Sequence, residues 1–185
     1  LLAGGGVIAY GDLEAGVGRL AALLKAKGVA PGDRVAVQAP KTPQSLMLYL
    51  ATLKIGAIFL PLNTAYTEAE VRYFLDDAEP KLFVTDAVAL AEEARGLAPT
   101  RDIHPAAADD LAAIIYTSGT TGRSKGAMLS HGNLASNALA LHKAWGFRPG
   151  DVLLHALPIF HVHGLFIALH CILLNGGPTI WLARF

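Results

Sequence analysis

The sequence predicts an α/β fold in which largely parallel sheets are covered by helices. Short apolar segments, typical of buried strands, alternate along the chain with longer amphipathic segments. Strands that are joined through helices form right-handed crossovers, which make the strands parallel and place helices on both faces of a sheet. Hydrophobic residues make up 53% of the 185 residues. A chain of this length and composition can bury a sizeable core.

Capping residues mark the helix starts in the first half of the chain. Asp12 is the predicted cap of a helix that ends at Gly28. Pro43 begins a second helix, which ends at Gly56, because the first helical position needs no N–H donor. Residues 67–70, Thr-Glu-Ala-Glu, form a capping box for a third helix. The predicted apolar faces are Leu13, Val17, Leu20 and Leu24, then Leu46, Leu50 and Leu53, then Val71, Phe74 and Leu75.

Short apolar runs between these helices are the predicted strands. They cover residues 34–38, 57–60, 82–85, 111–116, 152–155 and 179–182. Two further helices are predicted over 132–145 and 163–174, and the spacing of His142 and Trp145 places both on the buried face of the first. Residues 4–6, three glycines, are interpreted as a frayed terminus, and 106–110 as a linker.

Charge and hydropathy exclude two classes of partner. Fifteen basic and fifteen acidic residues cancel, so no basic field indicates binding to nucleic acid or to an anionic membrane. The longest apolar run, residues 46–62, is interrupted by Thr52, Lys54 and Gly56. A membrane span needs about 20 apolar residues. We therefore predict no membrane span, and interpret this run as a buried helix followed by a strand.

Cys171 is the single cysteine and cannot form an internal disulfide. Its neighbours are apolar, which predicts a buried structural thiol. A chain without disulfides is typical of a reducing compartment, so we expect a cytoplasmic protein, or one of the mitochondrial matrix if the source is eukaryotic. Nothing in the composition specifies an oligomeric state.

The most distinctive segment is residues 116–126, Tyr-Thr-Ser-Gly-Thr-Thr-Gly-Arg-Ser-Lys-Gly. Glycines let the backbone approach a ligand closely, hydroxyl groups add short donors, and a lysine adds a point charge, a combination that suits a polyphosphate. The candidate ligands are Thr117, Ser118, Gly119, Thr120, Thr121, Gly122 and Lys125. A Walker A loop is excluded, because Ser124 precedes the lysine and a glycine follows it. The alternative is a plain surface turn.

His161, His163 and Gly164 form a second candidate group. From spacing alone, a core histidine bonded to backbone is the favoured interpretation of His161. A metal pair with His163 lacks further clustered ligands. Gly164 suits a close approach of ligand or backbone, with an ordinary helix start as the alternative.

Both segments carry a family resemblance. Residues 116–126 closely resemble the phosphate loop of the adenylate-forming superfamily of acyl-CoA synthetases, luciferases and peptide-synthetase adenylation domains, with Ser124 where the usual form has Pro. Residues 157–166 resemble the segment that lines the acyl pocket of that family. The amino-acid sequences of these segments and of residues 60–67 are most similar to those of malonyl-CoA synthetases.

The resemblance implies a fold, a reaction and a set of roles. Residues 1–185 would be an incomplete N-terminal AMP-binding domain, part of the large N-terminal domain of such an enzyme, with the C-terminal lid domain absent. A small-molecule carboxylate, with malonate as the leading candidate, would react with ATP to form an acyl-adenylate, and coenzyme A would then displace AMP. The alternatives are a non-catalytic nucleotide-binding fragment and a ligase for an aryl or longer acid.

The resemblance also assigns residues to these steps. Lys125 and His161 would be catalytic, and residues 117–122 with Lys125 would hold the phosphates of ATP. Thr117 would contact Mg²⁺. His161 and Gly164 would border the bound acid.

Overall fold

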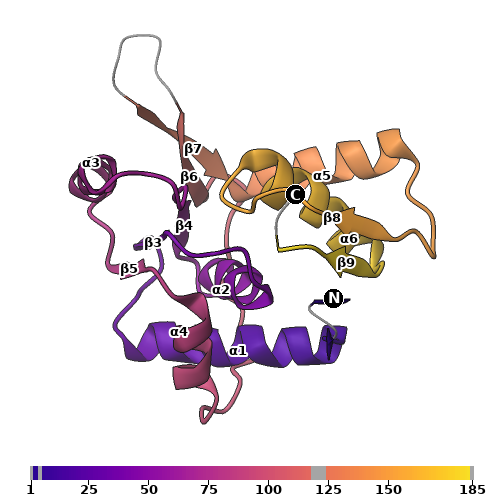
Figure 1. Cartoon of the computed structure of the whole chain (residues 1–185), viewed down its shortest axis with the longest axis horizontal. Helices are drawn as coiled ribbons and strands as arrows, with labels where there is room; N and C mark the ends of the chain where they lie inside the picture. The colour runs from indigo at the N-terminus through magenta and orange to yellow at the C-terminus, as the bar shows by residue number, and fades with distance from the viewer. Residues whose placement is uncertain (1, 4–5, 118–123, 184–185) are drawn as a thin grey trace.

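The computed structural model describes residues 2–3, 6–117 and 124–183, which form two sheets flanked by helices (Figure 1). The strands are β1 Leu2–Ala3, β2 Gly6–Val7, β3 Arg34–Val37, β4 Ile58–Pro61, β5 Leu82–Val84, β6 Leu111–Thr117, β7 Lys125–Ser130, β8 Leu153–His155 and β9 Thr179–Trp181. The helices are α1 Tyr10–Ala26, α2 Pro43–Lys54, α3 Glu68–Ala78, α4 Ala87–Ala94, α5 His131–Trp145, the π-helix η1 His163–Leu169 and α6 His170–Asn175.

The larger sheet has five strands in the order β5-β3-β4-β6-β7. The pairs β3–β4, β3–β5 and β4–β6 are parallel, as predicted for strands joined through helices. Strand β7 was not predicted, and it pairs antiparallel with β6. The two form a hairpin that projects from the body of the molecule beside α3 (Figure 1).

The smaller sheet has four strands in the order β2-β1-β9-β8. Its pairs β1–β9 and β8–β9 are parallel, and β1–β2 is antiparallel. The chain therefore brings its first residues next to its last strand. Gly6 belongs to β2 in this arrangement, so the prediction of a frayed terminus is wrong at that residue, while residues 4–5 lie outside the described ranges. The α/β class with largely parallel sheets is confirmed.

Two helices differ from their prediction. Helix α1 begins at Tyr10 with Ala9 as its N-cap, so Asp12 is not the cap; it occupies the third helical position, where its carboxylate accepts a bond from the Ala9 N–H at 3.3 Å. Helix α4 was not predicted. Asp86 caps it by accepting from the N–H groups of residues 88 and 89. The predicted caps Thr42 and Thr67 are confirmed.

The core lies between the larger sheet and helices α1, α2 and α4. The predicted apolar faces of α1 and α2 supply much of it, with Leu20, Leu24 and Leu46 almost fully buried. Cys171 is buried, as predicted. Trp145 is not in the core, because it lies in the last turn of α5 with 58% of its surface exposed. No helix within the described ranges is long and apolar enough to span a membrane.

Candidate active site

A cavity of about 320 Å³ lies where the carboxyl ends of both sheets meet. Its lining residues follow β3 (Ala39, Pro40, Lys41), β4 (Thr64), β8 (Ala156, Pro158, Ile159, Phe160) and β9 (Ala183). In open α/β sheets, ligands bind beyond the carboxyl ends of the strands, since loops there diverge and leave a crevice. The topology therefore places the candidate site at this junction.

The hairpin β6–β7 carries two of the predicted ligands at its outer end. Thr117 is the last residue of β6, Lys125 is the first residue of β7, and the two are paired in the antiparallel register. Both side chains are exposed. The pairing thus places the two residues opposite each other at the carboxyl end of β6. The predicted ligands Ser118, Gly119, Thr120, Thr121 and Gly122 lie outside the described residues.

Helix α3 braces the same end of this hairpin. The Tyr73 hydroxyl donates to the Ser124 carbonyl at 2.9 Å, and the Tyr116 hydroxyl donates to the Asp77 carboxylate. Burial raises the pKa of Tyr116, and the bond to Asp77 adds to this effect. The Phe74 ring lies 4.4 Å from the Tyr116 ring. The bond between Asp77 and Tyr116 joins residues 39 positions apart, and no local sequence pattern indicates it.

His161 lies on the loop between β8 and η1, which also lines the cavity. Its side chain is exposed, so the alternative of a core histidine is wrong. Its Nδ1 accepts a bond from the His163 N–H at 3.2 Å, and the two imidazole rings stack with centroids 5.3 Å apart. No group of three or more His, Cys, Asp or Glu side chains among the described residues is arranged to hold a metal ion.

Gly164 is buried where the same loop turns into η1. A Cβ at this position would overlap the carbonyl oxygen of Pro158. The sequence predicted a close approach to Gly164 by either a ligand or backbone, and the structure shows the approach of backbone. This packing fixes the loop against the start of η1.

Sequence reasoning missed two residues of the junction, Lys41 and His155. The Lys41 ammonium donates to the His155 carbonyl at 2.8 Å and lies 4.9 Å from the centre of the Trp181 ring. Burial lowers the pKa of Lys41 to about 8. His155 is almost fully buried and stacks on Trp181. No local motif marks these residues, because their partners lie far away in sequence.

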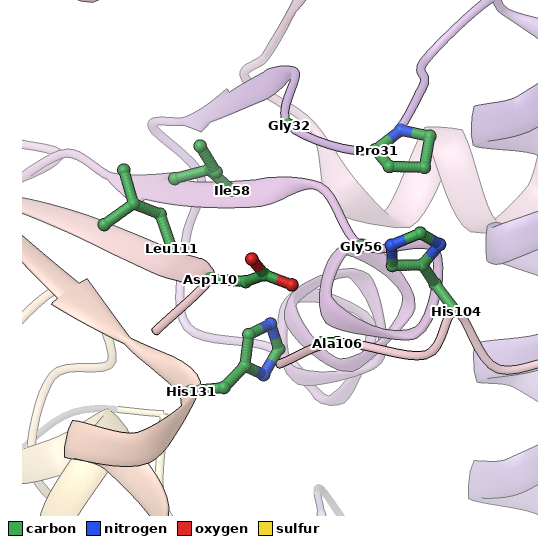
Figure 2. Close-up of a pocket in the computed structure, with 9 residues that line it drawn as sticks. All are labelled: Pro31, Gly32, Gly56, Ile58, His104, Ala106, Asp110, Leu111 and His131. Atoms are coloured by element: carbon green, nitrogen blue, oxygen red, sulfur yellow. The ribbon is translucent and has the colours of Figure 1, made fainter. Parts of the chain in front are cut away.

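A second cavity, of about 310 Å³, lies at the opposite edge of the larger sheet (Figure 2). Gly56, Asp110 and their neighbours line it where strands β4 and β6 begin. Figure 2 shows the Asp110 carboxylate and the rings of His104 and His131 around the same space. Desolvation lowers the pKa of His131, whose buried Nε2 has no partner within the described ranges. This cavity lies at the amino ends of the strands, apart from the predicted site residues.

Comparison with known proteins identifies the family of this chain. The chain belongs to the family of AMP-binding enzymes, whose model matches residues 2–185. The crystal structure of apo MatB from Rhodopseudomonas palustris is 46% identical, with a TM-score of 0.95 over 99% of this chain and 41% of that one. The ATP-bound structure of MatB gives 47% identity and a TM-score of 0.94 over the same shares. The predicted resemblance is confirmed.

Two curated relatives differ in the acid that they are named for. A feruloyl-CoA synthase from an Amycolatopsis species is 34% identical over 98% of this chain and 40% of its own length. A mitochondrial malonate–CoA ligase from Xenopus laevis is 32% identical over 83% of this chain and 31% of its own length. The chain thus spans well under half the length of these relatives.

Proposed function

We propose that this chain forms the N-terminal, nucleotide-binding part of an ATP-dependent acid–thiol ligase. A carboxylate oxygen of the acid attacks the α-phosphorus of ATP, and the bond to pyrophosphate breaks. The sulfur of coenzyme A then attacks the acyl carbon of the adenylate, and AMP leaves. The observation that carries the proposal is the pairing of Thr117 and Lys125 at the carboxyl end of β6, on the side of the sheets where the cavity lies.

The residues present suit the first step. The acid is ionised at neutral pH and is itself the nucleophile, so the protein must position the reactants and neutralise the growing charge on pyrophosphate. Lys125 supplies a cation for the phosphates at the end of the hairpin, and Thr117 supplies a hydroxyl for a phosphate oxygen or for Mg²⁺. Mg²⁺ keeps most of its water ligands and needs few protein groups. The ATP-bound structure of MatB supports the nucleotide part.

His161 and the cavity suit the acid. The exposed imidazole lies on the loop whose residues Pro158, Ile159 and Phe160 line the cavity. An imidazole N–H there is available to donate to a carboxylate or phosphate oxygen. Gly164 contributes by keeping this loop packed against η1. In this proposal, a small C-terminal lid outside residues 1–185 completes the enzyme.

The proposed acid is malonate. The similarity to the malonate–CoA ligase from Xenopus laevis and the sequence of residues 157–166 support this choice. A ligase for an aryl acid is the second candidate, since the feruloyl-CoA synthase is a relative of similar identity. The proposed location is the cytoplasm, or the mitochondrial matrix in a eukaryote.

Acid-dependent exchange of label between pyrophosphate and ATP tests the proposal. The longest natural form of the protein is assayed with Mg²⁺ and malonate, ferulate or a long-chain acid, and residues 1–185 are assayed in parallel. Exchange with malonate at a higher kcat/KM than with the other acids is expected. A preference for ferulate would replace malonate by the aryl acid, and a lack of exchange with every acid would overturn the ligase proposal. Exchange by residues 1–185 alone would exclude a non-catalytic fragment.

A further inference from the structure

His155 joins three parts of the molecule at the end of β8. Its Nε2 lies 3.0 Å from the Gly164 carbonyl oxygen, to which it donates. Its own carbonyl accepts from the Lys41 ammonium at 2.8 Å and from the Leu182 N–H at 3.1 Å. Its ring stacks on the Trp181 ring with centroids 5.2 Å apart. With 1% of its surface exposed, His155 is almost completely enclosed by the fold.

These contacts close the loop that carries His161. Residues 156–162 connect β8 to η1, and the bond from His155 to Gly164 ties the two ends of this loop together. At the end of the loop, the His161 carbonyl accepts from the N–H of Leu165 in η1 at 3.0 Å. The π-helical winding of η1 begins directly after it, and such windings are frequent at functional sites.

The protonation state of His155 lets its imidazole act as a hydrogen-bond donor at physiological pH. Burial lowers its pKa to about 4, so the imidazole is neutral at physiological pH. A neutral imidazole has one N–H, and the bond to the Gly164 carbonyl places that hydrogen on Nε2. Nδ1 is then an acceptor, and it has no partner within the described ranges. The buried Gly164 carbonyl would be costly to leave without a hydrogen-bond donor.

We propose that His155 is a positioning residue for acid activation: it closes the loop of residues 156–162 and thereby fixes the position of His161. This inference rests on the proposed function, because it assigns to His161 a contact with the acid. His155 does not itself touch the reactants in this scheme.

Two substitutions separate the donor from the ring. His155→Phe keeps an aromatic ring against Trp181 and removes the donor to Gly164, whereas His155→Gln keeps an N–H donor near the same place and loses the ring. The assay is the exchange of pyrophosphate with ATP, with the longest natural form of the protein and the acid that it uses best. We expect kcat/KM for the acid to fall at least tenfold in His155→Phe and less than threefold in His155→Gln. The KM for ATP should change less than twofold in both.

A double-mutant cycle distinguishes positioning from general damage. If His155 acts through His161, then adding His155→Phe to His161→Ala should cost less than a further twofold in kcat/KM for the acid. Losses that multiply in full would overturn the inference. An equal loss for the acid and for ATP would do the same.

A milder variant covers the case that His155→Phe does not fold. Lys41→Met removes the ammonium group, and with it the bond to the His155 carbonyl and the contact with the Trp181 ring, but keeps the length of the side chain. We expect a two- to fivefold fall in kcat/KM for the acid, and no further fall in the His161→Ala background. Full additivity there, or no effect in the wild-type background, would overturn the inference. Wild-type protein that exchanges with no acid would overturn the proposed function and this inference with it, whereas normal exchange in the His155→Phe variant would overturn this inference alone.

Discussion

The hairpin β6–β7 and the junction between β8 and η1 hold the side chains of the proposed site in opposite ways. At the hairpin, Thr117 and Lys125 are exposed and owe their position to the backbone pairing of two strands. At the junction, exposed His161 lies on a loop whose ends are joined by the bond between buried His155 and Gly164. The hairpin presents charge without burying it, whereas the junction buries a polar network beside the loop that carries His161.

This difference predicts how the two regions respond to substitution. An exposed lysine contributes little to packing, so its loss should change activity and leave stability intact. A buried network couples the two properties, since an unpaired polar group or a steric clash destabilises the fold. Stability measurements therefore separate the two regions as clearly as activity does.

Among the single substitutions, the largest effect is expected at Gly164. In Gly164→Ala, the new methyl group would overlap the Pro158 carbonyl oxygen and lie 2.9 Å from its carbon, so backbone must move. We expect a loss of about 3 kcal/mol or more in the free energy of unfolding, at the upper end of overpacking effects. Urea denaturation measures it.

Gly11→Ala is the matched control for this substitution. Gly11 lies in α1, and a Cβ there meets no atom within 4 Å. Alanine is favoured over glycine in helices by up to about 1 kcal/mol, so this variant should be neutral or slightly more stable. Equal losses in the two variants would show that the junction is not tightly packed.

Lys125→Ala should show the opposite behaviour. Removing a positioned cation from a site of developing phosphate charge typically costs about a hundredfold in rate. We expect a loss of this order in ATP–pyrophosphate exchange, with the free energy of unfolding unchanged within about 0.5 kcal/mol. Lys25→Ala, at an exposed lysine of α1, is the control and should leave both quantities unchanged. A normal exchange rate in Lys125→Ala would remove this residue from the proposed mechanism.

Acid pH should destabilise the fold through two buried histidines, His155 at the end of β8 and His170 in α6. Burial lowers the pKa of His155 and of His170 to about 4, from 6.5 in an unfolded chain. As pH falls from 6.5 toward 4, the unfolded state binds protons that the folded state does not, so stability is full above pH 6.5 and declines below it. At pH 5 the expected loss is about 2 kcal/mol for each histidine.

Urea denaturation at pH 7.5 and at pH 5 measures this dependence. His170→Gln removes one of the two titrating groups, and its amide can still form a hydrogen bond with the Tyr49 hydroxyl, which lies 2.8 Å from His170 Nε2. The variant should therefore lose about half of the difference between the two pH values. An unchanged difference would mean that His170 is not buried in its neutral form.

The sequence predicted the elements whose signal is local. Helices α1 and α2 bury one face each, and the periodicity of Leu20, Leu24 and Leu46 shows it. Strand β7 gave no such signal, because four of its six residues are exposed and it is held by backbone pairing with β6. Helix α4 is short, and its cap Asp86 was not recognised.

The candidate site divides in the same way. Thr117, Lys125 and His161 were predicted because they belong to motifs that are continuous in sequence. His155 and Lys41 were missed, since the bond between them joins residues 114 positions apart. The brace between Tyr73 and Ser124 spans 51 positions and was missed for the same reason. Contacts of this range are set by the packing of whole elements, which a local pattern does not encode.

The smallest predicted effect tests that brace. Tyr73→Phe removes only the hydroxyl that donates to the Ser124 carbonyl. The loss of one such bond costs about 1 kcal/mol, either in stability or, if the end of β7 shifts, as an approximately fivefold fall in ATP–pyrophosphate exchange. Tyr66→Phe is the matched control, since Tyr66 packs on Phe74 in the same aromatic cluster and its hydroxyl makes no hydrogen bond within the described ranges. Equal behaviour of the two variants would show that α3 supports the hairpin through ring packing and not through the hydroxyl.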